Sequence, residues 1–223
     1  SGRFQPIIHR GEVMQDSTAE IEVPSVAPCL NPARAGRHVR IRPVLPGDHK
    51  WLHELAVMTE QGARWRLQGT VPSFEQFLQV LYAGTHANFA LERARDGAAY
   101  GLCQLWQFDP LARTAHLTTM LAPGFVRKAW PMEGIFLFID YVFSCYGLRK
   151  LYLESLEDEA KQYAIGSRSL LVLEGKLKGH KFVHGRYVDN LIFALWRETF
   201  VAHRDHFLPV VTPLLPPESN EMI

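Results

Sequence analysis

Hydrophobic and polar residues alternate along the chain with two different periods. A period of two, typical of strands with one buried face, runs through residues 38–44, 88–94, 99–108, 113–121, 149–156, 172–182 and 188–197. Apolar residues three and four positions apart, typical of a helix packed on one face, begin after Asp48, begin again after Ser73 and recur over residues 135–146. The sequence therefore predicts alternating strands and helices between residues 38 and 208.

Local signals mark where several of these elements begin or turn. Asp48 precedes the first apolar period and is predicted to cap a helix there. Ser73 and Gln76 have the spacing of a capping box at the start of the second helix. The run Arg95-Asp96-Gly97 suits a tight turn, so the strands on either side of it are predicted to form a hairpin.

The order of the elements predicts an α/β (α+β) fold with a mixed central sheet of about seven strands flanked by about four helices. A polar helix over 157–169 and a hairpin linker between the last two strands complete this order, and the unit over 113–156 is predicted to be a parallel strand crossover. Residues 1–37 and the proline-rich residues 209–223 show no sustained period. One domain over 38–208, with an extension at each end, is expected.

Composition excludes several classes of protein. A hydrophobic content of 47% supports a sizeable core, and a net charge of +1 provides no global field that would recruit nucleic acid. The longest apolar run, 135–146, is too short to cross a membrane, and the N-terminus lacks the pattern of a signal peptide. The three scattered cysteines suggest neither a disulfide framework nor a zinc site, and His203 and His206 have no third ligand, so no metal is expected. A cytoplasmic protein is the expectation.

The run VRKAWPMEG, residues 126–134, lies between a predicted strand and a predicted helix. Many folds hold a phosphate group at this place, on backbone N–H groups near a helix N-terminus. Such loops are usually rich in glycine, whereas this one has Ala129 and Pro131, and proline removes an N–H donor. Arg127 and Lys128 could offset that loss through charge-assisted hydrogen bonds, while an ordinary strand-to-helix turn is the alternative.

The order of elements, together with the run from Glu174 to Phe200, resembles the GNAT superfamily of N-acyltransferases. Two motifs carry the resemblance to the branch that includes the ribosomal-protein acetyltransferases RimJ and RimL: the pair Glu174-Gly175, and the G-x-Y-x-D turn of Gly185, Tyr187 and Asp189. The run VRIRPVLPGD near the start is similar to the first strand and helix entry of that family. This resemblance covers about residues 38–200.

The resemblance implies acetyl-CoA or another acyl-CoA as the donor, held where the strand over 113–121 meets the following loop and helix. Trp130 offers a flat surface for a base or for the pantetheine arm. The donor-binding residues implied are Thr119, Met120, Leu121, Arg127, Lys128, Ala129, Trp130, Met132, Glu133 and Gly134.

The resemblance also implies residues for the chemistry. His116 lies where the family often has a carboxylate, and an imidazole that titrates near neutral pH suits a general base. Tyr163 is the tyrosine available as the general acid, although a partly buried surface tyrosine is the alternative. Glu154 and Ser155 are predicted to position the amine. The loop with Trp65 and Arg66 is predicted to face the acceptor and to expose Trp65 to some degree, with a core role for Trp65 as the alternative.

Three functions stay open at the level of the sequence. The first is an N-acyltransferase that moves an acyl group from acyl-CoA to a primary amine of a small molecule or a peptide N-terminus. The second is an acyltransferase whose donor is an aminoacyl-tRNA or a carrier-protein thioester, which is the one case where a nucleic acid would be a partner. The third is a non-catalytic binding protein with the same fold, since function depends on the site rather than on the fold. A homodimer is left open.

Overall fold

The computed structural model describes residues 32–126, 130–157, 159–160, 170–209 and 211–213. Tyr163, Arg127, Lys128 and Ala129 lie outside these residues, as does most of the helix predicted over 157–169. The elements in chain order are β1 (Arg34–Ala35), β2 (Val39–Pro43), a 3-10 turn (Pro46–Asp48), α1 (His49–Met58), α2 (Glu60–Arg64), α3 (Phe74–Tyr82), β3 (Thr85–Arg93), β4 (Ala99–Asp109), β5 (Thr114–Leu121), α4 (Trp130–Cys145), β6 (Lys150–Leu156), β7 (Leu171–Val183), β8 (Arg186–Trp196), α6 (Arg197–Phe207) and β9 (Thr212–Pro213).

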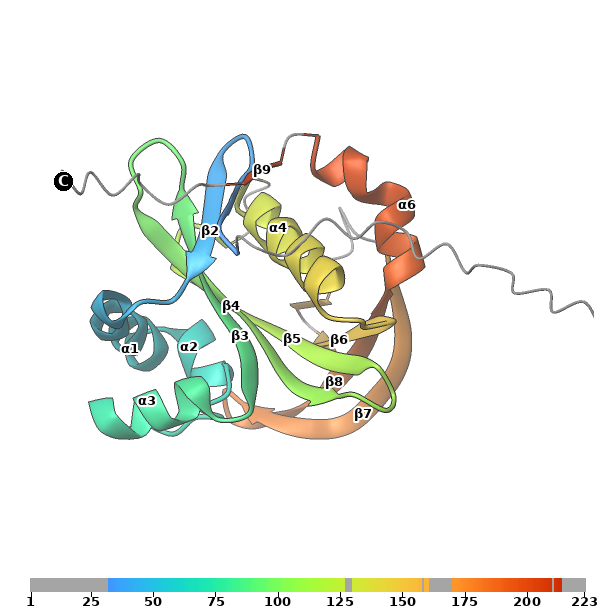
Figure 1. Ribbon diagram of the computed structural model, residues 1–223. Helices are drawn as coiled ribbons and strands as arrows, with labels where there is room; N and C mark the ends of the chain where they lie inside the picture. The colour runs from blue at the N-terminus through green and yellow to red at the C-terminus, as the bar shows by residue number, and fades with distance from the viewer. Residues whose placement is uncertain (1–31, 127–129, 158, 161–169, 210, 214–223) are drawn as a thin grey trace, which may run out of the picture.

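The strands form one sheet in the order β7-β8-β6-β5-β4-β3-β2-β1-β9. β5 and β6 run parallel, and the other neighbouring pairs are antiparallel. The predicted mixed sheet and the predicted parallel crossover through α4 are therefore confirmed. Within the described residues the sheet has nine strands, two of them only two residues long, and is therefore larger than the sequence predicts. β7 and β8 form a long, curved hairpin below the rest of the sheet (Figure 1).

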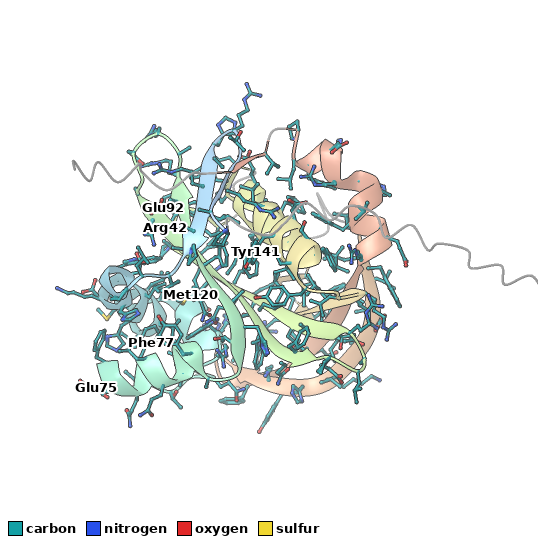
Figure 2. All side chains as sticks on the ribbon, viewed as in Figure 1. Arg42, Glu75, Phe77, Glu92, Met120 and Tyr141 are labelled. Atoms are coloured by element: carbon teal, nitrogen blue, oxygen red, sulfur yellow. The ribbon has the colours of Figure 1, made fainter. Side chains whose placement is uncertain are left out.

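Helices cover the two faces of the sheet differently. Leu102 and Met120 belong to a core cluster shared with α1, α3 and the loop that follows α2. Cys103 and Leu117, whose side chains point to the opposite face, belong to a larger cluster that includes α4 and residues of α6. Figure 2 shows Met120 on the side where α1, α2 and α3 gather, and Tyr141 on α4 on the other side. The sheet is therefore the middle layer between two separate cores.

Two of the predicted local signals are confirmed. The N–H of Gln76 donates to the Ser73 hydroxyl, and the N–H of Ser73 donates to the Gln76 side chain, so the capping box at the start of α3 is formed. β3 and β4 pair as a hairpin around Gly97, whose φ of 69° is in the left-handed region that favours glycine. Both signals depend on residues close together in sequence.

The prediction that Asp48 caps the first helix is wrong. Its side chain makes no capping bond to α1 and instead accepts hydrogen bonds from the Leu45 N–H at 2.7 Å and from the Arg42 guanidinium at 2.7 and 2.9 Å. Burial acts to raise the pKa of Asp48, but the bonds from Arg42 and Leu45 outweigh it and lower the pKa to about 2. Arg42 also binds Glu92, and Figure 2 shows these two side chains together beside β2. Asp48 thus fastens the turn before α1 to β2.

Other elements differ from the prediction as well. α4 already begins at Trp130, whereas the apolar pattern predicts the helix over residues 135–146, and its first turn adds Trp130 and Met132 to the packing against the core. The short helix α2 occupies part of the segment that the sequence predicts as a loop, and α6 follows β8 directly. In the part of the chain that the structure describes, no helix is both long enough and apolar enough to cross a membrane.

Parts of the two predicted extensions join the sheet. β1 pairs with β2 on one side and with β9 on the other, so the segments around residues 34 and 212 lie side by side. Asp140, which is 5% exposed in the middle of α4, accepts hydrogen bonds from both Arg34 on β1 and Arg204 on α6. One buried carboxylate therefore ties an early strand and a late helix to α4.

Candidate active site

β5 and β6 form a fork in the sheet. Their parallel pairing has only three register pairs and ends at His116 opposite Tyr152. Beyond this point β5 continues to Leu121 along β4, while β6 continues to Leu156 along β8. Among the described strands, the backbone of residues 117–121 therefore has no partner on the side toward β6. A fork of this kind leaves backbone donors and acceptors available to an extended ligand.

A pocket opens at the base of the fork. It has a volume of about 320 Å³, at the lower end of the range for ligand pockets. The lining comes from the last paired residues of β5 and β6, His116 and Tyr152, and from two further strands, with Glu174 and Gly175 on β7 and Ile192 on β8. Of the candidates for the chemistry, the structure thus places His116 in a pocket.

His116 lies between aromatic rings and one carboxylate. Its ring centroid is 5.6 Å from that of Trp106 and 5.3 Å from that of Tyr152, and its Nδ1 is 3.9 Å from a Glu154 oxygen. Burial lowers the pKa of His116, and the nearby Glu154 charge raises it by a smaller amount, so the net shift is downward. The imidazole is therefore neutral at neutral pH and able to accept a proton.

Glu154 and Ser155, predicted together as substrate contacts, point to opposite faces of β6. Glu154 shares the face of His116 and accepts a hydrogen bond from Asn190 Nδ2 at 2.9 Å. Ser155 donates to the adjacent Leu156 carbonyl at 3.2 Å, and strand alternation directs its side chain away from the pocket. The structure brings Glu154, but not Ser155, to the face of His116.

The buried Lys150 and the more exposed Glu174 form an ion pair at the edge of the pocket. Lys150 Nζ lies 2.9 and 3.1 Å from the two Glu174 oxygens, and it also lies over the rings of Tyr152 and Trp196 at 4.5 and 4.9 Å. Burial acts to lower the pKa of Lys150, but Tyr152 and Glu174 more than offset it and raise the pKa. The motifs included Glu174 but gave no hint of its pairing with Lys150, and they did not include Asn190. The alternation Lys150-x-Tyr152-x-Glu154 would have placed Lys150, Tyr152 and Glu154 on one face.

The predicted donor-binding residues that the structure describes lie on two elements, β5 and the start of α4. Thr119, Met120 and Leu121 lie on the stretch of β5 beyond the fork, and Met120 is fully buried, so only its backbone is available. Trp130 packs edge-on against Tyr100 and Phe125, with ring centroids 5.2 and 5.6 Å away.

The following turn of α4 is used mainly for packing. Glu133 accepts hydrogen bonds from the backbone N–H groups of Arg37 and His38. Met132 packs against the core, and Gly134 lies so close to the Tyr100 hydroxyl that a Cβ there would approach it to 2.5 Å. Within the described residues, these side chains therefore bind the protein itself.

Trp65 is buried, which agrees with the core role that the sequence left as the alternative, and Arg66 is half-buried beside it. Trp65 is 6% exposed and packs against Phe77 in the core beneath α1 and α3. The Arg66 guanidinium donates to the carbonyls of Leu81 and Ala83 at the end of α3, and burial lowers its pKa. Among the described residues, no group of three or more His, Cys, Asp or Glu side chains could hold a metal ion.

Known proteins resemble the chain in sequence and in structure. No family model matches it. The spermidine N(1)-acetyltransferase of Escherichia coli strain K12 is 23% identical over 185 residues, which cover 80% of this chain and 95% of that protein. The crystal structure of spermidine N-acetyltransferase from Vibrio cholerae in complex with CoA and spermine has a TM-score of 0.59 at 21% identity, covering 73% of this chain and 98% of that one. A GCN5-related N-acetyltransferase from Brucella melitensis has a TM-score of 0.62 at 23% identity, covering 79% and 84%.

Proposed function

We propose that this chain, which has the GNAT fold, transfers an acetyl or other acyl group from acyl-CoA to a primary amine of a small molecule. The single observation that carries the proposal is the fork between β5 and β6, which has His116 at its base beside a pocket. The acetyltransferases of Escherichia coli and Vibrio cholerae are named for spermidine and not for ribosomal proteins, so the RimJ and RimL branch is not the one they support. A polyamine is the acceptor class that we propose.

The unpaired side of β5 fits the donor. The pantetheine arm of CoA is an extended chain with amide groups, and such a chain can pair with exposed strand backbone as an added strand would. The backbone of Thr119, Met120 and Leu121 lies on this stretch. Contacts of the donor with Arg127, Lys128 and Ala129 stay a prediction, as do contacts with Trp130, Met132, Glu133 and Gly134.

His116 is suited to the role of general base. A neutral imidazole in the pocket can take one proton from the ammonium group of the acceptor, which frees the nitrogen lone pair to attack the thioester carbon. A C–N bond forms and the C–S bond breaks, with its electron pair going to sulfur. Of the two protons that the ammonium loses, one passes through His116 to water and the other ends on the thiol. Tyr163 as the acid that supplies the thiol proton stays a prediction.

The charges around the pocket fit a cationic acceptor. Both oxygens of Glu174 are occupied by Lys150, whereas Glu154 pairs with no lysine or arginine among the described residues. A carboxylate with no paired cation attracts an ammonium group. We therefore expect small amines with several ammonium groups to bind better than monoamines of the same length.

The test uses purified protein, acetyl-CoA and a panel of spermidine, spermine, a monoamine and a short peptide. Thiol release and the mass of the acetylated product report transfer, and the melting temperature with saturating CoA reports donor binding. We expect a raised melting temperature and product formation with spermidine or spermine. An unchanged melting temperature, together with no thiol release from any acceptor, would contradict the proposal.

A further inference from the structure

Three polar side chains line up across three neighbouring strands at the fork. Asn190 on β8 donates from Nδ2 to one oxygen of Glu154 on β6 at 2.9 Å. The other Glu154 oxygen lies 3.9 Å from Nδ1 of His116 on β5. This gap is too long for a hydrogen bond and suits an ion pair once His116 carries a proton. We call these three residues the fork triad.

Sheet register explains why the fork triad forms. His116 and Tyr152 are the last pair of β5 and β6, and Glu154 lies two residues farther along β6 on the same face. Glu154 is opposite Ile192, and Asn190 is two residues from Ile192 on β8, again on the same face. The carboxylate therefore lies one step inside the fork, between a buried amide and the imidazole.

Asn190 is much more buried than Glu154 and His116, so it can hold Glu154 in a fixed orientation toward His116. Asn190 is 2% exposed, so its amide is fixed, while the Glu154 side chain is 41% exposed and the His116 side chain 24%. Asn190 is therefore fixed within the sheet, whereas His116 lines the pocket. A base that is oriented by a third group is the usual arrangement for an activated proton acceptor.

Other charged groups near His116 are already engaged. Glu174 and Lys150 neutralise each other at the far side of the pocket. Arg66 lies over the Trp106 ring, 4.9 Å from its centroid, and donates to the end of α3. Among the described residues that face His116, Glu154 is thus the charge able to respond to protonation of the imidazole.

We propose that Glu154, held in place by Asn190, is a positioning residue that orients the His116 imidazole and stabilises it while it carries the proton of the substrate. This inference rests on the acyl transfer proposed above. In that reaction the proton from the amine adds to Nε2 of His116, the Nδ1–H points to Glu154, and the proton later leaves to water. Glu154 gains and loses no proton in this cycle.

Removal of the Glu154 charge should shift the pH dependence of turnover in a defined direction. His116 must be neutral to act as the base, so activity rises with pH through its pKa. The Glu154 charge raises that pKa, so Glu154→Gln lowers it and moves the acidic limb of the kcat profile to lower pH. We also expect kcat to fall on the order of tenfold, a fraction of what a general base contributes.

The test follows the His116 ring by NMR titration of the full chain without substrate, with His116→Asn used to assign the signal. Glu154→Gln and Asn190→Ala are compared with the control Glu157→Gln, which removes a carboxylate that pairs with Lys176 instead. We expect the pKa of His116 to fall in Glu154→Gln, to fall less in Asn190→Ala and to stay unchanged in the control. The acidic limb of the pH profile should move with it.

An unchanged pKa of His116 in Glu154→Gln would overturn the inference. So would a lowered pKa with an unchanged kcat and pH profile. The titration needs no activity, so it decides whether Glu154 acts on His116 even if the wild-type chain transfers no acyl group. That last result would contradict the proposed function instead.

Discussion

Two polar side chains next to Trp106 differ in whether they are already hydrogen-bonded to the protein. The Arg66 guanidinium lies 4.9 Å from the Trp106 ring centroid, and the His116 ring lies 5.6 Å from it. Arg66 donates to carbonyls at the end of α3, whereas His116 makes no hydrogen bond to the described residues and borders the pocket. A side chain near a candidate site is therefore a better candidate for function when its donors or acceptors are not already used within the protein.

Replacing His116 should produce the largest loss of turnover and the clearest difference from replacing Arg66. Loss of a general base reduces turnover by about 100- to 10,000-fold, so we expect His116→Asn to fall in this range while the fold is retained. Initial rates with acetyl-CoA and an active amine would measure it. The control His184→Asn changes an exposed histidine that pairs with Glu60, and it should leave turnover unchanged. Near-normal turnover in His116→Asn would remove His116 from the chemistry.

Replacing Arg66 should affect stability and leave the chemistry largely intact. Arg66→Met removes a charged donor from two carbonyls, and we expect a loss of about 2 kcal/mol in the free energy of unfolding. In a chain of this size that corresponds to a fall in melting temperature of about 4–8 °C. Arg95→Met, at an exposed arginine on the β3–β4 turn, is the matched control. A stable Arg66→Met variant with a raised KM for the amine would reverse the comparison and support the predicted contact of Arg66 with the substrate.

A substitution at the N-terminal end of α3 should have the smallest effect of the three on the protein. Ser73→Ala removes the capping bond to the Gln76 N–H and should cost about 1 kcal/mol. Chemical denaturation would measure it, and Ser73→Asp, which keeps an acceptor at the cap, should retain most of the stability. If Ser73→Ala costs more than Arg66→Met, the arginine contributes less to holding α3 than its contacts indicate.

The sequence predicts those features that depend on neighbouring residues. Strand alternation, the capping box at Ser73 and the hairpin around Gly97 need only a few positions in a row. The GNAT fold was predicted from motifs spread over the chain, and the structure and its likeness to solved acetyltransferases confirm it. The place of His116 on a strand followed from the pattern of residues 113–121, and its suggested role followed from the resemblance.

The surroundings of the site could not be predicted, because they depend on register between distant strands. The bond from Asn190 to Glu154 joins residues 36 positions apart, and the pair of Lys150 and Glu174 depends on a bulge in β7 between Leu173 and Gly175. For Trp65 the sequence left an exposed position and a core role open, and packing against Phe77 buries it. Tertiary packing decided each of these cases.

Asp140 also sets practical limits for shortening the protein. A version that begins after Arg34 or ends before Arg204 would remove one of the two guanidinium groups that bind this carboxylate. A buried charge left with fewer partners destabilises the helix that carries it. Shortened versions for crystallisation should therefore keep both arginines, even though Arg34 belongs to a strand of only two residues.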